Sequence, residues 1–478
     1  MDDGLEHPVV IIGGGFAGAY CAQRLERLLG AQAHNVLLLD RNNYLTFSPL
    51  LIEAGTGSLE PRHAVVSIRS FLRRARFAMG NVTAIDFANK TVTYQPAEDG
   101  QTRTAPYEHL VLAPGSITLL PGVPGLTEFG FEMKSLTDAV ALRDRAIWML
   151  EAADGEPDPQ MRAGMLHFVV AGGSFTGVEV AGEFDTFLHQ ASRRYHNIAP
   201  GECRITLVER GDRILPALDR DLAEYAAQRL RARKVDLVLN TTIGRVERDH
   251  ILLHDGRRID THTVIWCAGI APCPLVRTLD LPKDTRGYIL CEPDLRVKGT
   301  TDVWGIGDCA VNTDPTGQAY PATAQHAIRE GIAAADNIAA VLGGRPTRPF
   351  VYKSRGSLAP LGCRTAVAKI GPIKLSGLTA WFLWRTVYLL KMPGLARKLR
   401  VALDWTLDWF FHRDYVQLGV HPPPAPPGPP PSAQLRHPPI VVMAPPPKFP
   451  VPALPPPPPP RPKINLVEAM ARAHEEED

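Results

Sequence analysis

Residues 7–25 read HPVVIIGGGFAGAYCAQRL and contain the pattern that decides the fold. The apolar run 9–12 is typical of a strand buried on both faces of a parallel sheet. It leads into a turn of the form G-x-G-x-x-G, built by three glycines: Gly13, Gly15 and Gly18. A helix pattern follows, and then a second apolar stretch, NVLLLD, which ends in Asp40. This order of strand, turn, helix, strand and acid predicts a dinucleotide-binding unit.

The chemistry explains the residue types in this unit. Glycines let the backbone approach a pyrophosphate, and the N-terminus of the helix offers free N–H groups and a partial positive charge. The carboxylate of Asp40 can accept hydrogen bonds from ribose hydroxyls. A turn with a purely structural role is the alternative interpretation, but the complete flanking pattern favours nucleotide binding.

A second copy of the pattern occupies residues 166–184, LHFVVAGGSFTGVEVAGEF. Its three positions hold Gly172, Ser174 and Gly177, and the strand pattern CRITLVER that follows contains Glu209. Ser174 adds a side chain where backbone and phosphate should nearly touch, so looser binding or a different angle of approach is expected. The alternative is a degenerate copy that serves only for packing.

Both strands end in a carboxylate at the place where the ribose 2′-hydroxyl would lie. A negative charge there disfavours the 2′-phosphate of NADPH. We therefore expect NADH at the second site, although Arg210 next to Glu209 weakens the preference.

Length and charge exclude several classes of protein. A chain of 478 residues is long enough for two or three domains. The formal net charge of +2 argues against a nucleic-acid partner. The seven cysteines lack the spacing of a metal site or a disulfide framework, which fits a reducing compartment. The N-terminus MDDGLEHP does not resemble a signal peptide, and no apolar run is long enough to cross a bilayer.

Two further segments suggest how the first unit closes. LVLAPGS at 110–116 ends the first half, and VWGIGDCA at 303–310 returns to it. Two nested nucleotide-binding folds of this kind resemble the flavin-dependent pyridine-nucleotide oxidoreductases, in which the first fold holds FAD and the inserted second fold holds NAD(P)H.

Within that superfamily the chain resembles the type II, non-proton-pumping NADH:quinone oxidoreductases over about residues 8–418. The resemblance rests on four stretches: DRNNYLTFSPLL (40–51), GGSFTGVEVAGEF (172–184), TVIWCAGI (263–270) and PATAQHAIREG (321–331). It implies an α/β fold with two nested Rossmann-like domains and a C-terminal helical region. The expected boundaries are 1–115 and 291–350 for the FAD domain, 116–290 for the NADH domain, 351–420 for the membrane-docking or dimer region, and 421–478 for a tail.

The resemblance also implies two sets of binding residues. The expected FAD contacts are Gly13, Gly15, Phe16, Ala17, Gly18, Asp40, Arg41, Ala113, Gly115, Gly307, Asp308, Ala324 and Gln325. The expected NADH contacts are Gly172, Ser174, Phe175, Thr176, Gly177, Glu179, Glu209, Ala268 and Gly269. No metal is expected.

Two residues are expected to be catalytic. Gln325 stands in the first turn of an alanine-rich helix pattern, from which the matching family glutamine reaches the flavin ring and the quinone. Glu179 matches a glutamate near the nicotinamide, where it would orient NADH or relay a proton; a role in capping its helix is the alternative. The family often carries a second glutamine where this chain reads Arg329-Glu330, so a quinone pocket of different polarity is expected. His326 is more simply a structural residue than a proton donor.

The absence of a cysteine pair helps to identify the class of electron acceptor. Disulfide reductases of the superfamily carry a cysteine pair after the second strand, but residues 41–70 contain no cysteine. A quinone that reaches the flavin directly fits best. Sulfide-linked chemistry is an alternative that would need Cys363 and a partner thiol. Another alternative is a flavoprotein that senses NADH and regulates a partner through its tail.

Residues 375–418 are expected to dock on a membrane. Apolar residues recur at helical spacing, among basic residues and tryptophans. The apolar set is Leu378, Trp381, Phe382, Leu389, Leu399, Ala402, Leu403, Leu407 and Phe410; the basic set is Arg385, Lys391, Arg397, Lys398 and Arg400; the other tryptophans are Trp384, Trp405 and Trp409. We expect two helices in the membrane plane, at the cytoplasmic face of the inner or cell membrane. Ordinary core packing and a homodimer contact are the alternatives.

After His421 the composition changes abruptly, because 22 of the 45 prolines fall between Pro422 and Pro462. Such a segment cannot form a packed core, so an extended spacer is expected, or else a ligand for an SH3-like domain. The last residues, INLVEAMARAHEEED, have the pattern of a short helix.

Overall fold

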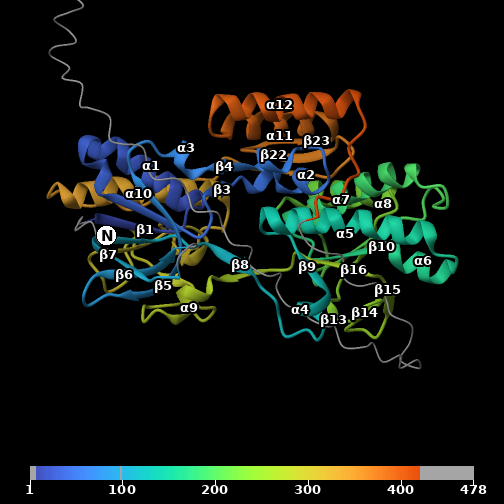
Figure 1. Cartoon of the computed structure of the whole chain (residues 1–478), viewed down its shortest axis with the longest axis horizontal. Coiled ribbons are helices and arrows are strands. Elements are labelled where there is room, and N and C mark those ends of the chain that lie inside the picture. The colour runs from blue at the N-terminus through green and yellow to red at the C-terminus, as the bar shows by residue number, and fades with distance from the viewer. Residues whose placement is uncertain (1–6, 97–99, 420–478) are drawn as a thin grey trace, which may run out of the picture. The chain divides into compact units, whose positions relative to one another are not determined.

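The structure of the chain is a computed structural model that describes residues 7–96 and 100–419 (Figure 1). The predicted proline-rich spacer and terminal helix lie outside these residues. The helices are α1 Phe16–Leu29, α2 Leu51–Gly55, α3 Ile68–Phe71, α4 Leu126–Phe129, α5 Leu136–Gly155, α6 Pro159–Met165, α7 Phe175–Ala191, α8 Arg220–Ala232, α9 Pro274–Thr278, α10 Ala324–Leu342, α11 Gly377–Lys391 and α12 Leu395–Phe410.

The first sheet is built around the strand that opens the sequence pattern. Its strands are β1 His7–Ile12, β2 Val36–Asp40, β5 Arg76–Asp86, β6 Thr91–Pro96, β7 Arg103–Leu112 and β19 Val303–Gly305. β1 lies between β2 and β7 and is parallel to both, with Val9 opposite Val36 on one side and His109 on the other. β19, from the segment VWGIGDCA, pairs in parallel with β7. The predicted return of the chain to the first sheet is therefore confirmed.

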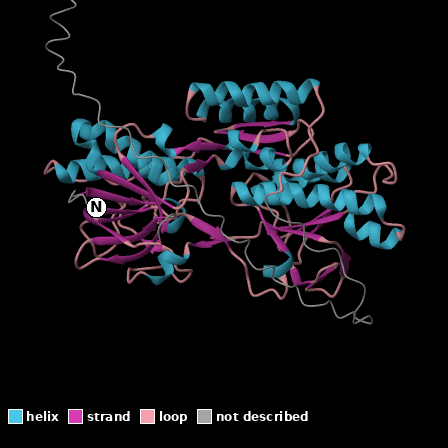
Figure 2. Cartoon of the chain, viewed as in Figure 1, coloured by secondary structure: helices cyan, strands magenta, loops and turns pink. Residues whose placement is uncertain are grey.

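The second sheet repeats this arrangement for the second glycine pattern. Its order is β12 Asp236–Val238, β11 Arg204–Val208, β10 His167–Ala171, β16 Thr263–Trp266 and β9 Gly130–Glu132, and all pairs are parallel. A smaller antiparallel sheet accompanies it: β13 Ile243–Val246, β14 His250–Leu253 and β15 Arg258–Asp260. Figure 2 shows the strands gathered into two groups with helices beside each. The predicted pair of Rossmann-like units is confirmed.

Short strands connect the two sheets or support their loops. β8 Ser116–Thr118 pairs with β17 Ile270–Pro272, and β18 Ile289–Leu290 pairs with β20 Ala310–Val311. β3 Tyr44–Thr46 pairs with β4 Val65–Ser67. Antiparallel β8 and β17 mark where the chain leaves the first unit and where it comes back. The domain boundaries themselves stay a prediction.

The alanine-rich helix α10 packs closely against α1. A Cβ atom added to Gly331 would lie 2.2 Å from the carbonyl oxygen of Ala17, so the two backbones touch at this point. The small residues of α10 permit this approach. As a result α10 begins beside the first glycine turn.

The C-terminal segment joins the two hydrophobic cores. β21 Ser357–Pro360, β22 Ala366–Ile370 and β23 Ile373–Ser376 form an antiparallel sheet that precedes α11 and α12. Val367 belongs to the core around the second sheet, whereas Trp384, Val401 and Trp405 belong to the core around the first. No helix within the described ranges is long and apolar enough to cross a membrane.

The two predicted amphipathic helices exist, but their inward faces differ from the prediction. Trp381, Trp384 and Trp405 were expected at the membrane interface and are instead buried. Arg385 was expected among the membrane-facing basic residues and is also buried, as an ion-pair partner. Helical spacing alone does not say which of two faces meets the core, and here the large rings fill it.

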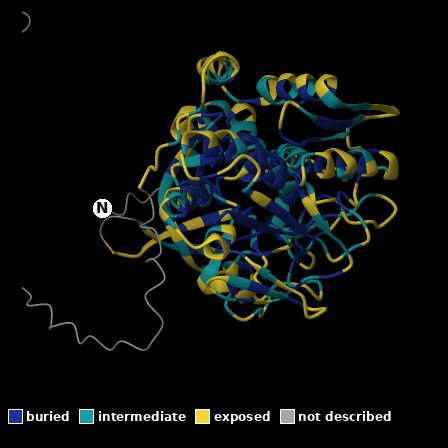
Figure 3. Cartoon of the chain, turned by 90° about the vertical axis from the view of Figure 1, so that its right-hand side faces the viewer, coloured by how far each residue is buried: buried dark blue, intermediate teal, exposed yellow. Residues whose placement is uncertain are grey.

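The outward face of these helices matches the prediction better. Figure 3 shows exposed residues, in yellow, on the helices at the top of the view. The exposed apolar residues are Leu378, Phe382, Leu390, Leu395, Leu399, Leu403, Leu407, Trp409 and Phe410. These residues of α11 and α12, most of them three to five positions apart, are called the apolar row below.

Candidate active site

The first glycine turn is shaped by close backbone contacts. Gly13 has φ +103°, and a Cβ atom there would lie 2.1 Å from the carbonyl oxygen of Ala113. A Cβ atom on Gly18 would lie 1.9 Å from the carbonyl oxygen of Gly13. By contrast, a Cβ atom on Gly15 would meet nothing within 4 Å. The turn therefore leaves open space at its middle glycine, where a pyrophosphate could approach the N-terminus of α1.

The second turn repeats this geometry. Gly172 has φ +104°, and a Cβ atom on Gly177 would lie 1.8 Å from the carbonyl oxygen of Gly172. Gly172 also lies next to Ala268, one of the predicted NADH contacts. Ser174 is the exposed N-cap of α7, and its side chain caps no helical N–H group. Its hydroxyl is free to face a ligand, and the predicted looser binding stays a prediction.

The carboxylate at the end of each second strand holds its turn directly. Asp40 accepts hydrogen bonds from the backbone N–H groups of Gly14 at 2.5 Å and Asn42 at 2.7 Å. Glu209 accepts the corresponding bonds from Gly173 at 2.5 Å and Gly211 at 2.7 Å. Burial raises the pKa of Asp40 above its ordinary value. Sequence reasoning anticipated only ribose contacts for these acids, because this anchoring depends on the folded turn.

The segment GIGD lies beside the first turn, as predicted. A Cβ atom on Gly307 would lie 3.0 Å from that of Ala17, and Asp308 accepts a hydrogen bond from the Ser116 hydroxyl at 3.1 Å. The backbone N–H of Gly307 donates to the buried carboxylate of Glu330 at 2.6 Å. Burial raises the pKa of Glu330 to about 7. Glu330, which we expected to change the quinone pocket, instead supports the GIGD turn.

Gln325 is the second residue of α10 and contacts the segment before β21. Its amide nitrogen donates to the Ser354 hydroxyl at 3.0 Å and to the Gly356 carbonyl at 3.3 Å, and its oxygen accepts from the Tyr352 hydroxyl at 3.3 Å. Arg329 lies over the ring of Tyr352, 5.7 Å from its centroid. Gln325 thus lies in a polar, basic environment rather than in an apolar one.

His326 is buried and fixed by its neighbours. Its Nδ1 lies 2.7 Å from the Thr323 hydroxyl, and its ring packs between Tyr320 and Tyr352. Burial lowers the pKa of His326. These contacts fit the structural role that the sequence favoured.

Tyr388 of α11 lies near the predicted FAD contacts, and sequence reasoning missed it. Its ring lies 6.3 Å from that of Phe47, which lies 5.7 Å from that of Phe16 in the first turn. Burial, and after it the negative charge of Glu179, raises the pKa of Tyr388. Burial and the neighbouring Glu183 raise the pKa of Glu179 well above its ordinary value.

The chain is similar to known proteins over most of its length. Residues 7–331 match the pyridine nucleotide-disulphide oxidoreductase family, and residues 354–414 match the NDH2 C-terminal domain. Type II NADH:quinone oxidoreductase Ndh of Mycobacterium tuberculosis is 32% identical over 422 residues, which cover 85% of this chain and 89% of that protein. The chain belongs to the type II NADH:quinone oxidoreductase family.

Other relatives and solved structures agree with this assignment. Demethylphylloquinone reductase NdbB of Synechocystis is 31% identical over 412 residues, which cover 84% of this chain and 97% of that protein. The structure of NDH2 from Plasmodium falciparum in complex with NADH matches with a TM-score of 0.79 at 19% identity, over 85% of this chain and 99% of that one. The latter likeness concerns the fold.

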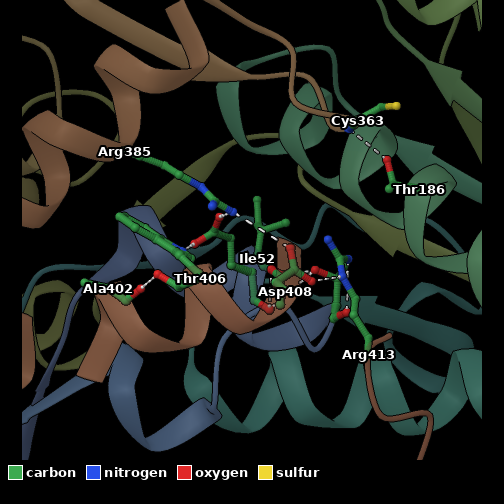
Figure 4. Close-up of polar contacts among 12 residues, drawn as sticks. Ile52, Thr186, Cys363, Arg385, Ala402, Thr406, Asp408 and Arg413 are labelled. Carbon is green, nitrogen blue, oxygen red and sulfur yellow. Dashed lines mark hydrogen bonds and ion pairs between the residues drawn. The ribbon is translucent and has the colours of Figure 1, made fainter. Parts of the chain in front are cut away.

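This type II family member fixes its C-terminal helices through a buried ionic cluster (Figure 4). Glu53 of α2 accepts hydrogen bonds from the Trp405 indole at 2.7 Å and from Arg385 at 3.5 Å. The Arg385 guanidinium lies 4.1 Å from the ring centroid of Trp381 and 4.7 Å from that of Trp405. Asp408 is 4.0 Å from Arg385. The cluster thereby joins α2, α11 and α12.

The end of the described chain extends the cluster. Arg413 donates to Asp408 at 2.8 Å and to the carbonyl of Thr56, just after α2, at 3.3 Å. Removing one partner of such a buried pair typically costs about 3–5 kcal/mol, because the other charge is left without compensation. The C-terminal helices are therefore an integral part of the fold.

Cys363 lies away from the second glycine turn. It is exposed in the turn between β21 and β22, and its backbone N–H donates to the Thr186 hydroxyl at 3.0 Å (Figure 4). Thr186 is twelve residues beyond Ser174 on α7, which places it about 18 Å along the helix from that turn.

We predict a pH dependence of stability from the ionic cluster. Burial raises the pKa of Glu53 to about 7, despite the opposing effect of Arg385. A raised pKa means that the folded protein holds this proton more tightly than the unfolded chain, so the contribution of Glu53 is lost as pH rises from about 4.5 to 7. The stability of the wild type relative to Glu53→Gln should fall by about 3 kcal/mol or less across this range. Thermal unfolding of the two FAD-loaded proteins between pH 5 and pH 8 measures the difference.

The exposed Glu60, seven residues away, supplies a matched control. Glu60→Gln should follow the wild type at every pH. Parallel pH curves for Glu53→Gln and the wild type would contradict the prediction.

Proposed function

We propose that this chain is an FAD-dependent NADH:quinone oxidoreductase that reduces a membrane quinone by two electrons without pumping protons. The observation that carries the proposal is the pair of glycine turns, each held by its own carboxylate, in a chain without cysteine at residues 41–70. Two nucleotides can be held, and no thiol pair is present there to receive the electrons. The names of the relatives supply the acceptor class.

The first turn fits FAD by its own geometry. Open space at Gly15, the anchored Asp40 and the neighbouring Asp308 suit a pyrophosphate, a ribose and a polyol chain, respectively. Phe16, Ala17, Arg41, Ala113, Gly115, Gly307 and Ala324 complete the proposed FAD contacts. When bound, FAD supplies the redox chemistry that connects a hydride donor with a quinone.

The second turn is proposed to hold NADH through residues Gly172 to Gly177, Glu209, Ala268 and Gly269. Positioning is the main task of this site, because hydride transfer requires close, aligned reacting atoms. Glu179 would orient the nicotinamide, and burial raises the pKa of its carboxyl well above the ordinary value.

Gln325 is proposed to bind the quinone headgroup. Its amide nitrogen donates to Ser354 and Gly356, and its oxygen accepts from Tyr352, so the side chain is oriented before any ligand arrives. A quinone carbonyl only accepts hydrogen bonds, so binding would exchange one of the two N–H bonds for a bond to the headgroup. Burial, followed by the positive charges of Arg355 and Arg329, lowers the pKa of nearby Lys391. This surplus of positive charge would favour a headgroup that gains electron density on reduction.

Gln325→Leu provides a direct test of the acceptor site. It should slow reoxidation by a soluble quinone by about tenfold, since one hydrogen bond to the headgroup is lost. Bleaching of the flavin by NADH under anaerobic conditions should change less than about twofold. Stopped-flow absorbance of the two half-reactions separates these effects. An equal decrease in the rates of both half-reactions would contradict the assignment of Gln325 to the quinone site.

The two turns also provide a matched test of nucleotide assignment. Glu209→Gln should raise kcat/KM for NADPH relative to NADH by about tenfold or more, because a negative charge facing the 2′-phosphate is removed. The amide oxygen can still accept one backbone hydrogen bond, so the turn should remain formed. Asp40→Asn, the same change at the first turn, should leave the NADPH to NADH ratio unaltered. If Asp40→Asn changed the NADPH to NADH ratio and Glu209→Gln did not, the first turn would bind NADH and the second turn would bind FAD.

We further propose that the apolar row docks the protein peripherally on the cytoplasmic face of the membrane. A quinone is dissolved in the bilayer, and α12 exposes Leu399, Leu403 and Leu407 at four-residue spacing. Insertion of such a face below the headgroups is favourable by about 25 cal/mol per Å² of apolar surface. A homodimer formed through the same row is the competing arrangement.

Point substitutions test the docking without disturbing the buried cluster. The triple change Leu399→Ser, Leu403→Ser and Leu407→Ser should weaken liposome binding by about a hundredfold or more. Thermal stability should hardly change, because all three side chains are exposed. Flotation with neutral liposomes measures the binding.

The matched control replaces Leu28 and Leu342, which are exposed on α1 and α10, by serine. It should float like the wild type. The triple variant could instead float with liposomes like the wild type and show a lower molar mass in light scattering. The apolar row would then be a dimer contact, and the docking proposal would fail.

A further inference from the structure

A basic groove lies beside the start of the apolar row on α12. It has a volume of about 930 Å³ and is bordered by the second half of α1, residues 66–74, and the Pro393–Gly394 turn with the start of α12. Five arginines line it: Arg27, Arg73, Arg74, Arg397 and Arg400. Neither the nucleotide sites nor the quinone site accounts for this concentration of charge.

The arginines keep their charge uncompensated. Arg27 donates to the Gln23 amide, Arg74 to the Gly30 carbonyl, and Arg397 to the carbonyls of Arg62 and Val65. All of these acceptors are neutral. Among the described residues, none of the five guanidinium groups lies within 4.0 Å of a carboxylate.

The carboxylate that lines the groove does not neutralise it. Glu26 is buried, and one of its oxygens accepts three backbone N–H groups, those of Arg73, Arg74 and Ala75, at 2.6–2.8 Å. Glu26 therefore fixes the backbone of the loop that carries Arg73 and Arg74. Within the groove, burial lowers the pKa of Arg397, and the positive charge of the neighbouring Arg400 adds to the shift.

The position of the groove identifies its ligand class. Leu395 and Leu399, which are 73% and 63% exposed, share the first turns of α12 with Arg397 and Arg400. A ligand bound by these arginines would meet positive charge in the groove and apolar surface next to it. A soluble phosphate ester would use only the charge, whereas a lipid would use both.

We propose that this groove binds the anionic headgroup of a membrane phospholipid, whose acyl chains lie along the apolar row. The inference rests on the proposed membrane docking and adds lipid selectivity to it. Arg73 and Arg400 are exposed and make no hydrogen bond through their side chains in the described structure, so they are free to turn toward a phosphate. Arginine suits this role because its planar fork matches phosphate oxygens.

The test compares vesicle binding of full-length, FAD-loaded protein. Vesicles of phosphatidylcholine alone and vesicles with a fifth of phosphatidylglycerol are used at about 150 mM salt. The wild type should bind the anionic vesicles about tenfold or more tightly, and Arg73→Gln with Arg400→Gln should lose this preference. Binding to neutral vesicles, flavin content and soluble-quinone activity should not change in the double variant.

The charge-matched control is Arg257→Gln with Arg258→Gln, in the β14–β15 hairpin, far from α12 in Figure 1. It should retain the preference. A wild type that binds both kinds of vesicle equally would overturn the lipid site while leaving the docking proposal intact, whereas no binding to either vesicle would overturn both.

A final arm distinguishes a lipid from a soluble ligand. Inorganic phosphate is added to the wild type and the double variant, and thermal unfolding is followed. Stabilisation of the wild type alone, together with no preference for anionic vesicles, would assign the groove to a soluble phosphate ester and overturn the lipid proposal. Anionic selectivity without stabilisation by phosphate would support it.

Discussion

The Arg385 guanidinium, held between two indole rings and facing the Glu53 carboxylate, is the interaction on which the rest of the structure depends. It fixes the rotation of α11 against α2, because neither charge can move without being stranded in the core. Tyr388 follows one helical turn later on the same helix and packs near Phe47, which lies against Phe16 at the first glycine turn. A displacement of Arg385 would therefore also move Tyr388, because the two residues are three positions apart on the same helix.

Two buried carboxylates, Glu53 and Glu179, lie near a third acidic residue, Glu183 of α7. Burial, and with it the negative charge of Glu183, raises the pKa of both Glu53 and Glu179. Arg385 offsets part of this effect at Glu53, to which it donates a hydrogen bond. These two carboxyl groups therefore hold their protons to higher pH than exposed carboxylates do.

The sequence predicted the local units well and their tertiary contacts poorly. Both glycine turns, both second strands and the helix bearing Gln325 are specified by short patterns whose causes are local. The function of Glu330 could not be predicted in this way, because its partner Gly307 lies 23 residues away. Tyr388 escaped notice for a similar reason, since an aromatic residue in an amphipathic helix carries no signal of what it touches. The membrane-interface prediction for Trp381, Trp384 and Trp405 was wrong because tryptophan is favourable both at a membrane interface and in a protein core.

The distribution of tryptophan gives the protein a built-in optical probe. Four of the seven tryptophans lie in α11 and α12, yet Trp409, which is 42% exposed, is the only exposed tryptophan in the described chain. It stacks 6.0 Å from Trp381 and lies under Arg364. On contact with a bilayer, Trp409 would therefore be the exposed tryptophan ring that passes from water to lipid. The neighbouring buried tryptophans would keep their surroundings. Emission colour and quenching by aqueous iodide would then report the depth of one known side chain without any attached dye.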